Sequence, residues 1–155
     1  MRAKVLAAIV GSIVLSLALT AAAKDTVRCE VLTIEASNSG HGIDPALRAH
    51  SAIFGKPPFS AFNSFRLVQR QALDVALGAP AQLTLPQPFS GSLGFNGEQQ
   101  GKLNLSLTLA RSQAQPIVIN GKASPGAPFF AAGFRSATGT WIFGVLCDRN
   151  GVIAH

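Results

Sequence analysis

The stretch LNLSLTL, residues 103–109, decides the fold class of this chain. Leucines alternate with polar residues without a break, and this period of two predicts a strand with one buried face and one solvent-facing side. The segment 89–95 precedes it, and the turn residues from Asn96-Gly97 to Gly101 connect the two, which predicts a β-hairpin. The chain is therefore expected to build at least one sheet around this pair.

Short strands separated by turn residues are expected along the rest of the chain. Apolar and β-branched runs predict further strands at 27–37, 61–70, 73–77, 81–85, 116–120, from 129 onward and at 140–147. Asp44 followed by Pro45 predicts the start of one short helix near 44–54. About eight or nine short strands with one helix predict a mainly β fold, either a single β-sandwich or a small barrel.

The first 23 residues have the parts of an export signal. Arg2 and Lys4 precede an apolar run at 5–19, and three alanines follow at 21–23. The apolar run is shorter than the roughly 20 residues of a membrane-spanning helix. We therefore expect cleavage after Ala23, a periplasmic or secreted protein, and one β-rich domain over 24–155 without a transmembrane segment.

The chain contains two cysteines, Cys29 and Cys147, near the ends of this domain. In an oxidising compartment such a pair predicts a disulfide, whereas two unpaired buried thiols are the alternative. Each cysteine lies in a strand-like segment. A bridge would therefore make the first and last strands neighbours, or place them across the core from each other.

The basic excess is modest and dispersed. The chain has 13 Lys and Arg against 7 Asp and Glu, and loss of the signal leaves 11 against 7, a net charge of +4. The basic residues are scattered along the sequence and form no run: Arg28, Arg48, Lys56, Arg66, Arg70, Lys102, Arg111, Lys122, Arg135 and Arg149. Nucleic-acid binding is not expected, because it requires clustered basic side chains together with aromatic side chains on which the nucleobases stack. The two alternatives are a soluble surface with a modest basic excess and attraction to anionic envelope polymers or lipid headgroups.

Catalytic chemistry has little support in the sequence. His41 lies close to Asp44, but no His or Cys pair has the spacing of a metal site, and no cofactor is expected. The segment 91–94 (GSLG) lacks the spacing of a nucleophile elbow. We assign no catalytic residue, and a small envelope hydrolase using His41 and Asp44 is kept as an alternative.

The segment KPPFSAFNSF, residues 56–65, is the most unusual local feature. A proline-stiffened entry leads into Phe59, Phe62 and Phe65. If the three rings are exposed together, they mark a partner-binding surface. The alternative is that they anchor the helix and its loop onto the sheet, as buried aromatic residues commonly do.

Three patterns in this region carry a family resemblance: DPxL at 44–47, PPFSxFxxFRL at 57–67 and GxPxxLxLP at 78–86. Over residues 27–146 the chain resembles uncharacterised exported β-rich proteins of Gram-negative bacteria. The resemblance implies an exported β-sandwich and supplies no catalytic residues. The cysteines are not part of the pattern.

These observations lead to one functional hypothesis and two alternatives. We expect an exported, non-enzymatic accessory or binding protein of the cell envelope that contacts an unidentified envelope or secreted protein. The alternatives are the hydrolase with His41 and Asp44, and adhesion to an anionic polymer of the envelope.

Overall fold

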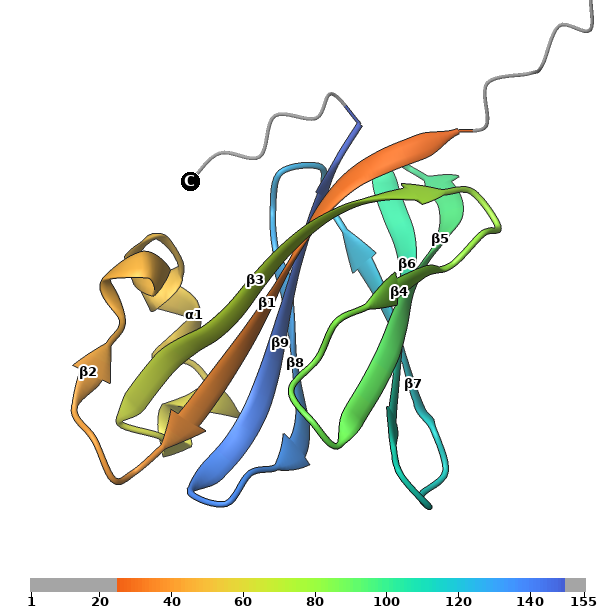
Figure 1. Cartoon of the computed structure of the whole chain (residues 1–155). Coiled ribbons are helices and arrows are strands. Elements are labelled where there is room, and N and C mark those ends of the chain that lie inside the picture. Colours follow the sequence, from red (N-terminus) through yellow and green to blue (C-terminus); the bar gives the residue numbers. More distant parts are fainter. Residues whose placement is uncertain (1–24, 150–155) are drawn as a thin grey trace, which may run out of the picture.

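The computed structural model of the protein describes residues 25–149, so the predicted signal peptide at 1–23 lies outside the described residues. Within this range the strands form two separate sheets, of five and four strands, which face each other (Figure 1). This arrangement confirms the β-sandwich among the two folds that were expected. None of the helices in residues 25–149 is long and apolar enough to span a bilayer.

The five-stranded sheet has β1 at its centre. Its order is β2 (Gly42–Ile43), β3 (Ser64–Ala76), β1 (Thr26–Ser37), β9 (Gly139–Asp148) and β8 (Phe129–Arg135). Val27 and Val31 of β1 belong to the core between the sheets, whereas Leu32 and Ile34 belong to a second core on the outer face. Apolar and polar residues alternate along β1, but the apolar positions change from the inner face to the outer face between Val31 and Leu32, so the strand is buried on both faces.

The four-stranded sheet contains the strand that decided the fold class. Its order is β4 (Ala81–Leu83), β5 (Phe89–Gln99), β6 (Lys102–Arg111) and β7 (Ile117–Ala123). The four leucines at 103, 105, 107 and 109 are buried between the sheets, and the polar residues between them lie on the partly exposed face. The alternation is therefore confirmed. The expected strands at 81–85 and 116–120 are displaced by a few residues at their ends.

The predicted hairpin between β5 and β6 is confirmed, and the chain reverses at the end of the expected turn region, residues 96–101. β5 continues through Asn96 and Gly97, where the register with β6 shifts between Phe95 and Glu98. The reversal is made by Gln100 and Gly101, with φ of 53° and 72°. Two consecutive positive φ angles match a type I′ turn, which suits the twist of a tight hairpin. Asn96-Gly97 is therefore a bulge, not the turn.

The expectation of separate strands at 61–70 and 73–77 is wrong. A single strand, β3, pairs with β1 along its length, because no turn residue interrupts it. A register shift opposite Thr33 and Ile34 turns its side chains over partway. Phe65 therefore packs on the outer face, while Val75 packs between the sheets.

A helical segment covers the outer face of the five-stranded sheet (Figure 1, left). It consists of η1 (Pro45–His50), α1 (Ser51–Phe54) and η2 (Phe59–Ala61). The Asp44 carboxylate caps η1 by accepting the Ala46 N–H, with Pro45 at the first position, as predicted. Leu47 and Phe54 of this segment are buried in the second core. The molecule thus has three layers around two cores.

The predicted disulfide between Cys29 and Cys147 is confirmed. The two residues lie directly opposite each other in the antiparallel pairing of β1 with β9. Both are fully buried in the core between the sheets. The first and last strands are therefore neighbours in one sheet, which was one of the two arrangements expected.

Candidate functional site

The three phenylalanines of the 56–65 segment are not exposed together. Phe59 and Phe65 are only 7% and 4% exposed, and Phe62 is partly buried beside them. Phe65 stacks on Phe54 of α1 with ring centroids 4.4 Å apart. The rings fasten the helical segment to the sheet, which is the alternative considered from the sequence. A binding role for them stays a prediction without an exposed surface.

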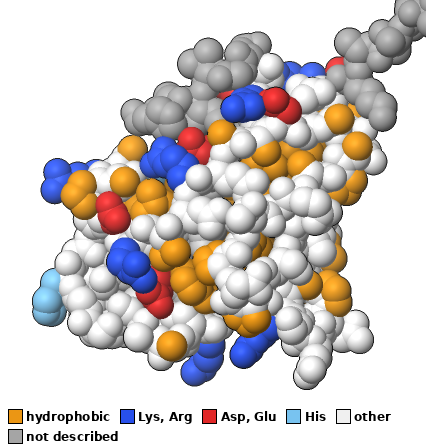
Figure 2. Space-filling model, viewed as in Figure 1, with side chains coloured by type: hydrophobic (Ala, Val, Ile, Leu, Met, Phe, Trp, Pro, Cys, Tyr) orange, Lys and Arg blue, Asp and Glu red, His pale blue; other side chains and the backbone are white. Residues whose placement is uncertain are grey.

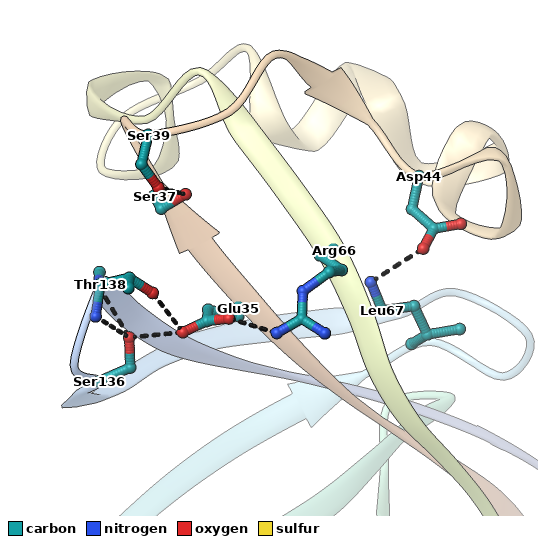
Figure 3. Close-up of polar contacts among 9 residues, drawn as sticks. Glu35, Ser37, Ser39, Asp44, Arg66, Leu67, Ser136 and Thr138 are labelled. Atoms are coloured by element: carbon teal, nitrogen blue, oxygen red, sulfur yellow. Dashed lines mark hydrogen bonds and ion pairs between the residues drawn. The ribbon is translucent and has the colours of Figure 1, made fainter.

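His41 and Asp44 share a shallow hollow of about 320 Å³ with Ser64 and Arg66. Both carboxylate oxygens of Asp44 accept backbone N–H groups, one from Ala46 at 2.9 Å and one from Leu67 at 3.2 Å. Figure 3 shows the bond that ties Asp44 to β3. This carboxylate stabilises the chain entry into η1, and no hydrogen bond in the described range joins it to His41.

A different cavity, of about 420 Å³, opens at the end of the sandwich between the two sheets. Its wall contains four charged and two aromatic side chains: Glu35, Arg66, Arg111, Arg135, Phe89 and Trp141. Gln87, Pro88, Ser136 and Ala137 complete the lining. We call this cavity the arginine mouth.

Six strands contribute one charged or aromatic residue each to the arginine mouth. β1, β6 and β8 end there, and β3, β5 and β9 begin there, at the lower end of the sandwich in Figure 1. Side chains that are scattered in the sequence therefore meet because antiparallel strands bring alternate ends together. In Figure 2, blue side chains at the lower edge of the visible face have no red neighbour.

Glu35 is the anchor of this site. Its Oε1 accepts hydrogen bonds from the hydroxyls of Ser136 at 2.8 Å and Thr138 at 2.7 Å. Its Oε2 receives the Arg66 guanidinium at 2.5 Å. Figure 3 shows the Glu35 carboxylate held between the β8–β9 loop and β3. The carboxylate is therefore fully engaged, and only 14% of the side chain is exposed.

These contacts keep Glu35 ionised. The hydrogen bond from Thr138 and that from Arg66 are the largest effects that lower the pKa of Glu35 from its ordinary value of 4.5, and Ser136 adds to them. Burial acts in the opposite direction but is outweighed. At neutral pH the lining consequently carries one negative charge.

The β8–β9 loop that holds Glu35 is fixed by its own backbone. The Ser136 hydroxyl accepts N–H bonds from Thr138 and Gly139, so the loop folds around this side chain. At Gly139 a β-carbon would lie 1.8 Å from the carbonyl oxygen of Ala36. Only glycine permits β9 to start this close to β1.

The three arginines are unequally engaged. Arg66 pairs with Glu35, although its side chain is 64% exposed. Arg111 and Arg135 are exposed, and neither forms an ion pair with any of residues 25–149. Three positive charges against one negative charge give the mouth a local excess of two. Two guanidinium groups therefore have their donors free for an external acceptor.

An aromatic wall lies beside these charges. Phe89 meets Trp141 edge-on at a centroid distance of 6.3 Å and stacks on Phe134 at 5.0 Å. Trp141 is partly buried and is the single tryptophan of a chain without tyrosine. The mouth therefore combines an apolar side with free cationic donors, a combination that suits an amphipathic anionic ligand.

The sequence contains these residues but no local signal that unites them. Arg111 follows the LNLSLTL strand, so its placement at the end of a sheet was foreseeable, whereas Arg66 fell in the middle of the strand expected at 61–70 and no end was predicted for the strand that contains Arg135. Which ends meet depends on the order of the strands. No cluster of three His, Cys, Asp or Glu side chains within residues 25–149 has the arrangement to hold a metal ion.

Comparisons of the chain with protein-family models, curated proteins and solved structures find no match.

Proposed function

We propose that this is an exported, non-enzymatic binding protein of the cell envelope, periplasmic or secreted, whose arginine mouth holds an anionic group of its ligand. The observation that carries the proposal is the free pair of guanidinium groups, Arg111 and Arg135, beside an aromatic wall. Guanidinium groups form paired, charge-assisted hydrogen bonds with carboxylates and phosphates. This replaces contact through the phenylalanine segment as the favoured mode of binding.

Export is supported by two independent features. The export-signal pattern occupies residues 1–23, and the Cys29–Cys147 disulfide suits an oxidising compartment. N-terminal sequencing of the protein recovered from its compartment is expected to begin at Lys24. A protein that retains its first 23 residues and stays in the cytoplasm would contradict this part of the proposal.

Binding is favoured over hydrolysis by the state of the two best-placed carboxylates. Asp44 accepts two backbone N–H bonds, and Glu35 accepts bonds from three side chains. A general base needs a free oxygen and a pKa near the working pH, whereas the pKa of Glu35 is lowered. Neither carboxylate is poised to take a proton from a water or hydroxyl nucleophile.

Anion binding can be measured directly on the purified, disulfide-bonded protein. Phenyl phosphate and benzoate serve as anionic probes, and benzyl alcohol serves as the neutral probe of similar shape, in isothermal titration calorimetry at low salt. The anions are expected to bind and the alcohol is not. Binding should weaken as salt rises, because exposed charges are screened.

The variant Arg111→Gln/Arg135→Gln tests where the anion lies. We expect its affinity for the anionic probes to fall at least about tenfold, the loss of roughly one charge-assisted hydrogen bond. Arg48→Gln is the matched control, since Arg48 is an exposed arginine of η1 outside the mouth. Equal binding by the parent and the double variant, or no anion binding at all, would overturn the proposed function.

A further inference from the structure

The charge of the arginine mouth is a guide to the charge of its ligand. Arg66, Arg111 and Arg135 against Glu35 leave a local excess of two positive charges, and the contacts of Glu35 keep it ionised at neutral pH. A single carboxylate would leave one of these charges unmatched. A phosphate monoester, which carries close to two negative charges at pH 7, would match both.

The donor geometry leads to the same class of ligand. Each guanidinium presents a planar fork of N–H groups, and Arg111 and Arg135 have no carboxylate partner in the described part of the chain. A terminal phosphate has three oxygens and can accept from two forks at once, which one carboxylate does less completely.

The aromatic wall adds a requirement for an organic part. Trp141, Phe89 and Pro88 belong to the lining of the cavity, and the rings of Phe89 and Trp141 contact each other. A volume of about 420 Å³ lies in the range of small-ligand sites and exceeds what a bare inorganic phosphate occupies. The ligand is therefore expected to carry an apolar or aromatic group next to its phosphate.

The rest of the described surface argues for one compact anion in place of a long polyanion. Of the four other arginines within residues 25–149, three are paired: Arg28 with Asp74, Arg70 with Glu30, and Arg149 with Glu98, whereas Arg48 lies apart on η1. A chain of phosphates would need a continuous row of free cations along its path.

Resting on the proposed function, we infer that the arginine mouth recognises a phosphate monoester whose organic part lies against Trp141. The phosphate is held by Arg111 and Arg135, with Arg66 at the edge of the site. The same chemistry occurs in soluble phosphomonoesters and in lipids with a terminal phosphate, so the experiment separates these two sources.

Because Trp141 is the single tryptophan of the chain and lines the cavity, its fluorescence reports on binding at this site. Trp141 emission is followed while the parent protein is titrated at about pH 7.5 with phenyl phosphate, benzoate and inorganic phosphate. We expect phenyl phosphate to change the emission and to bind at least about tenfold more tightly than either of the others. If benzoate binds as tightly as phenyl phosphate, the inference is overturned while the proposed function stands. If no anion binds, both fall.

A second arm uses the ionisation of the ligand. Lowering the pH to about 5 takes phenyl phosphate below its second pKa near 6, while benzoate stays ionised. The ionisable groups lining the mouth are Glu35, whose pKa is lowered by its contacts, and three arginines; a guanidinium group does not deprotonate in proteins. Affinity for phenyl phosphate should fall several-fold and that for benzoate should not. Parallel changes for the two probes would overturn the inference.

The source of the phosphate is separated with vesicles. Phosphatidylcholine vesicles are prepared with phosphatidic acid, a phosphomonoester, or with phosphatidylglycerol, a phosphodiester, and protein flotation is measured. Binding only to the vesicles with phosphatidic acid supports a lipid source. Binding to neither kind of vesicle, by a protein that binds phenyl phosphate in the fluorescence titration, supports a soluble source. Equal binding to both vesicles that Arg111→Gln/Arg135→Gln abolishes would overturn monoester recognition.

Discussion

Cys29 and Cys147, 118 residues apart in sequence, face each other across β1 and β9 and join the first and last strands of the five-stranded sheet. Because the bridge closes almost the whole described chain, it strongly restricts the unfolded state. In the chain-entropy model such a long loop contributes most of the stabilisation a disulfide can give. The bridge also fixes β1, the strand that carries Glu35.

Replacing both cysteines with alanine is expected to lower the free energy of unfolding by about 2–5 kcal/mol. Denaturant titration of the parent and of Cys29→Ala/Cys147→Ala measures the loss. The parent unfolded in the presence of reductant is the control and should approach the stability of the double variant. Unchanged stability in both would contradict a structural role for the bridge.

Substitutions of the phenylalanines in the 56–65 segment should lower the stability of the fold in proportion to the burial of each ring, and should leave ligand binding unchanged. Phe65→Ala removes a ring stacked on Phe54 and is expected to lower the free energy of unfolding by about 3–5 kcal/mol. Phe62→Ala, at a partly buried ring, should lower it by about 1 kcal/mol. Thermal unfolding measures both. If Phe62→Ala keeps its stability but no longer captures a partner, the phenylalanine segment would again be the favoured binding surface.

The lowered pKa of Glu35 has a direct consequence for acid stability. A carboxyl with a lower pKa in the folded state stabilises the fold above its ordinary value of 4.5 and loses that contribution as the pH falls through the lowered value. The parent should therefore lose more stability than Glu35→Gln between about pH 6 and about pH 3. Thr138→Ala, which removes the largest of the pKa-lowering contacts, should give an intermediate profile. Parallel profiles would contradict this role.

The substitution Glu35→Gln should also strengthen anion binding. Glu35→Gln releases Arg66 from its ion pair and raises the local positive excess of the mouth by one. The affinity for phenyl phosphate is expected to rise about two- to fivefold, the worth of one exposed ion pair. Ser136→Ala, which loosens the same loop without changing charge, should show no gain. Weaker binding by Glu35→Gln would mean that Glu35 orients Arg66 for the ligand instead of competing with it.

Much of the fold was readable from local patterns. The alternation of leucine with polar residues placed β6, the Asp44-Pro45 pair placed the helical segment, and the two cysteines together with the predicted export signal indicated the bridge. The division of β3 into two strands was wrong, because a register shift within β3 hides the continuity of that strand. The β5–β6 hairpin was predicted correctly, and consecutive positive φ angles at Gln100 and Gly101 place its reversal at the end of the expected turn region.

The arginine mouth was beyond the reach of the sequence, because it is a property of strand order. Arg66, Arg111 and Arg135 are dispersed along the chain and come from both sheets. The exposure of Phe59 and Phe65 was equally undecidable, since it depends on the helical segment lying on the outer face of the sheet. Local patterns report which face of an element is apolar, but not what covers that face.

The most direct test of the account is the response of the arginine side chains to a bound anion. In ¹⁵N spectra of the purified protein, each Nε–Hε signal is assigned by its Arg→Gln variant and followed as phenyl phosphate is added. We expect the signals of Arg111 and Arg135 to shift most, that of Arg66 to shift less, and that of Arg48 to stay in place. Equal shifts at Arg48 and in the mouth, or none at Arg111 and Arg135, would contradict the central claim.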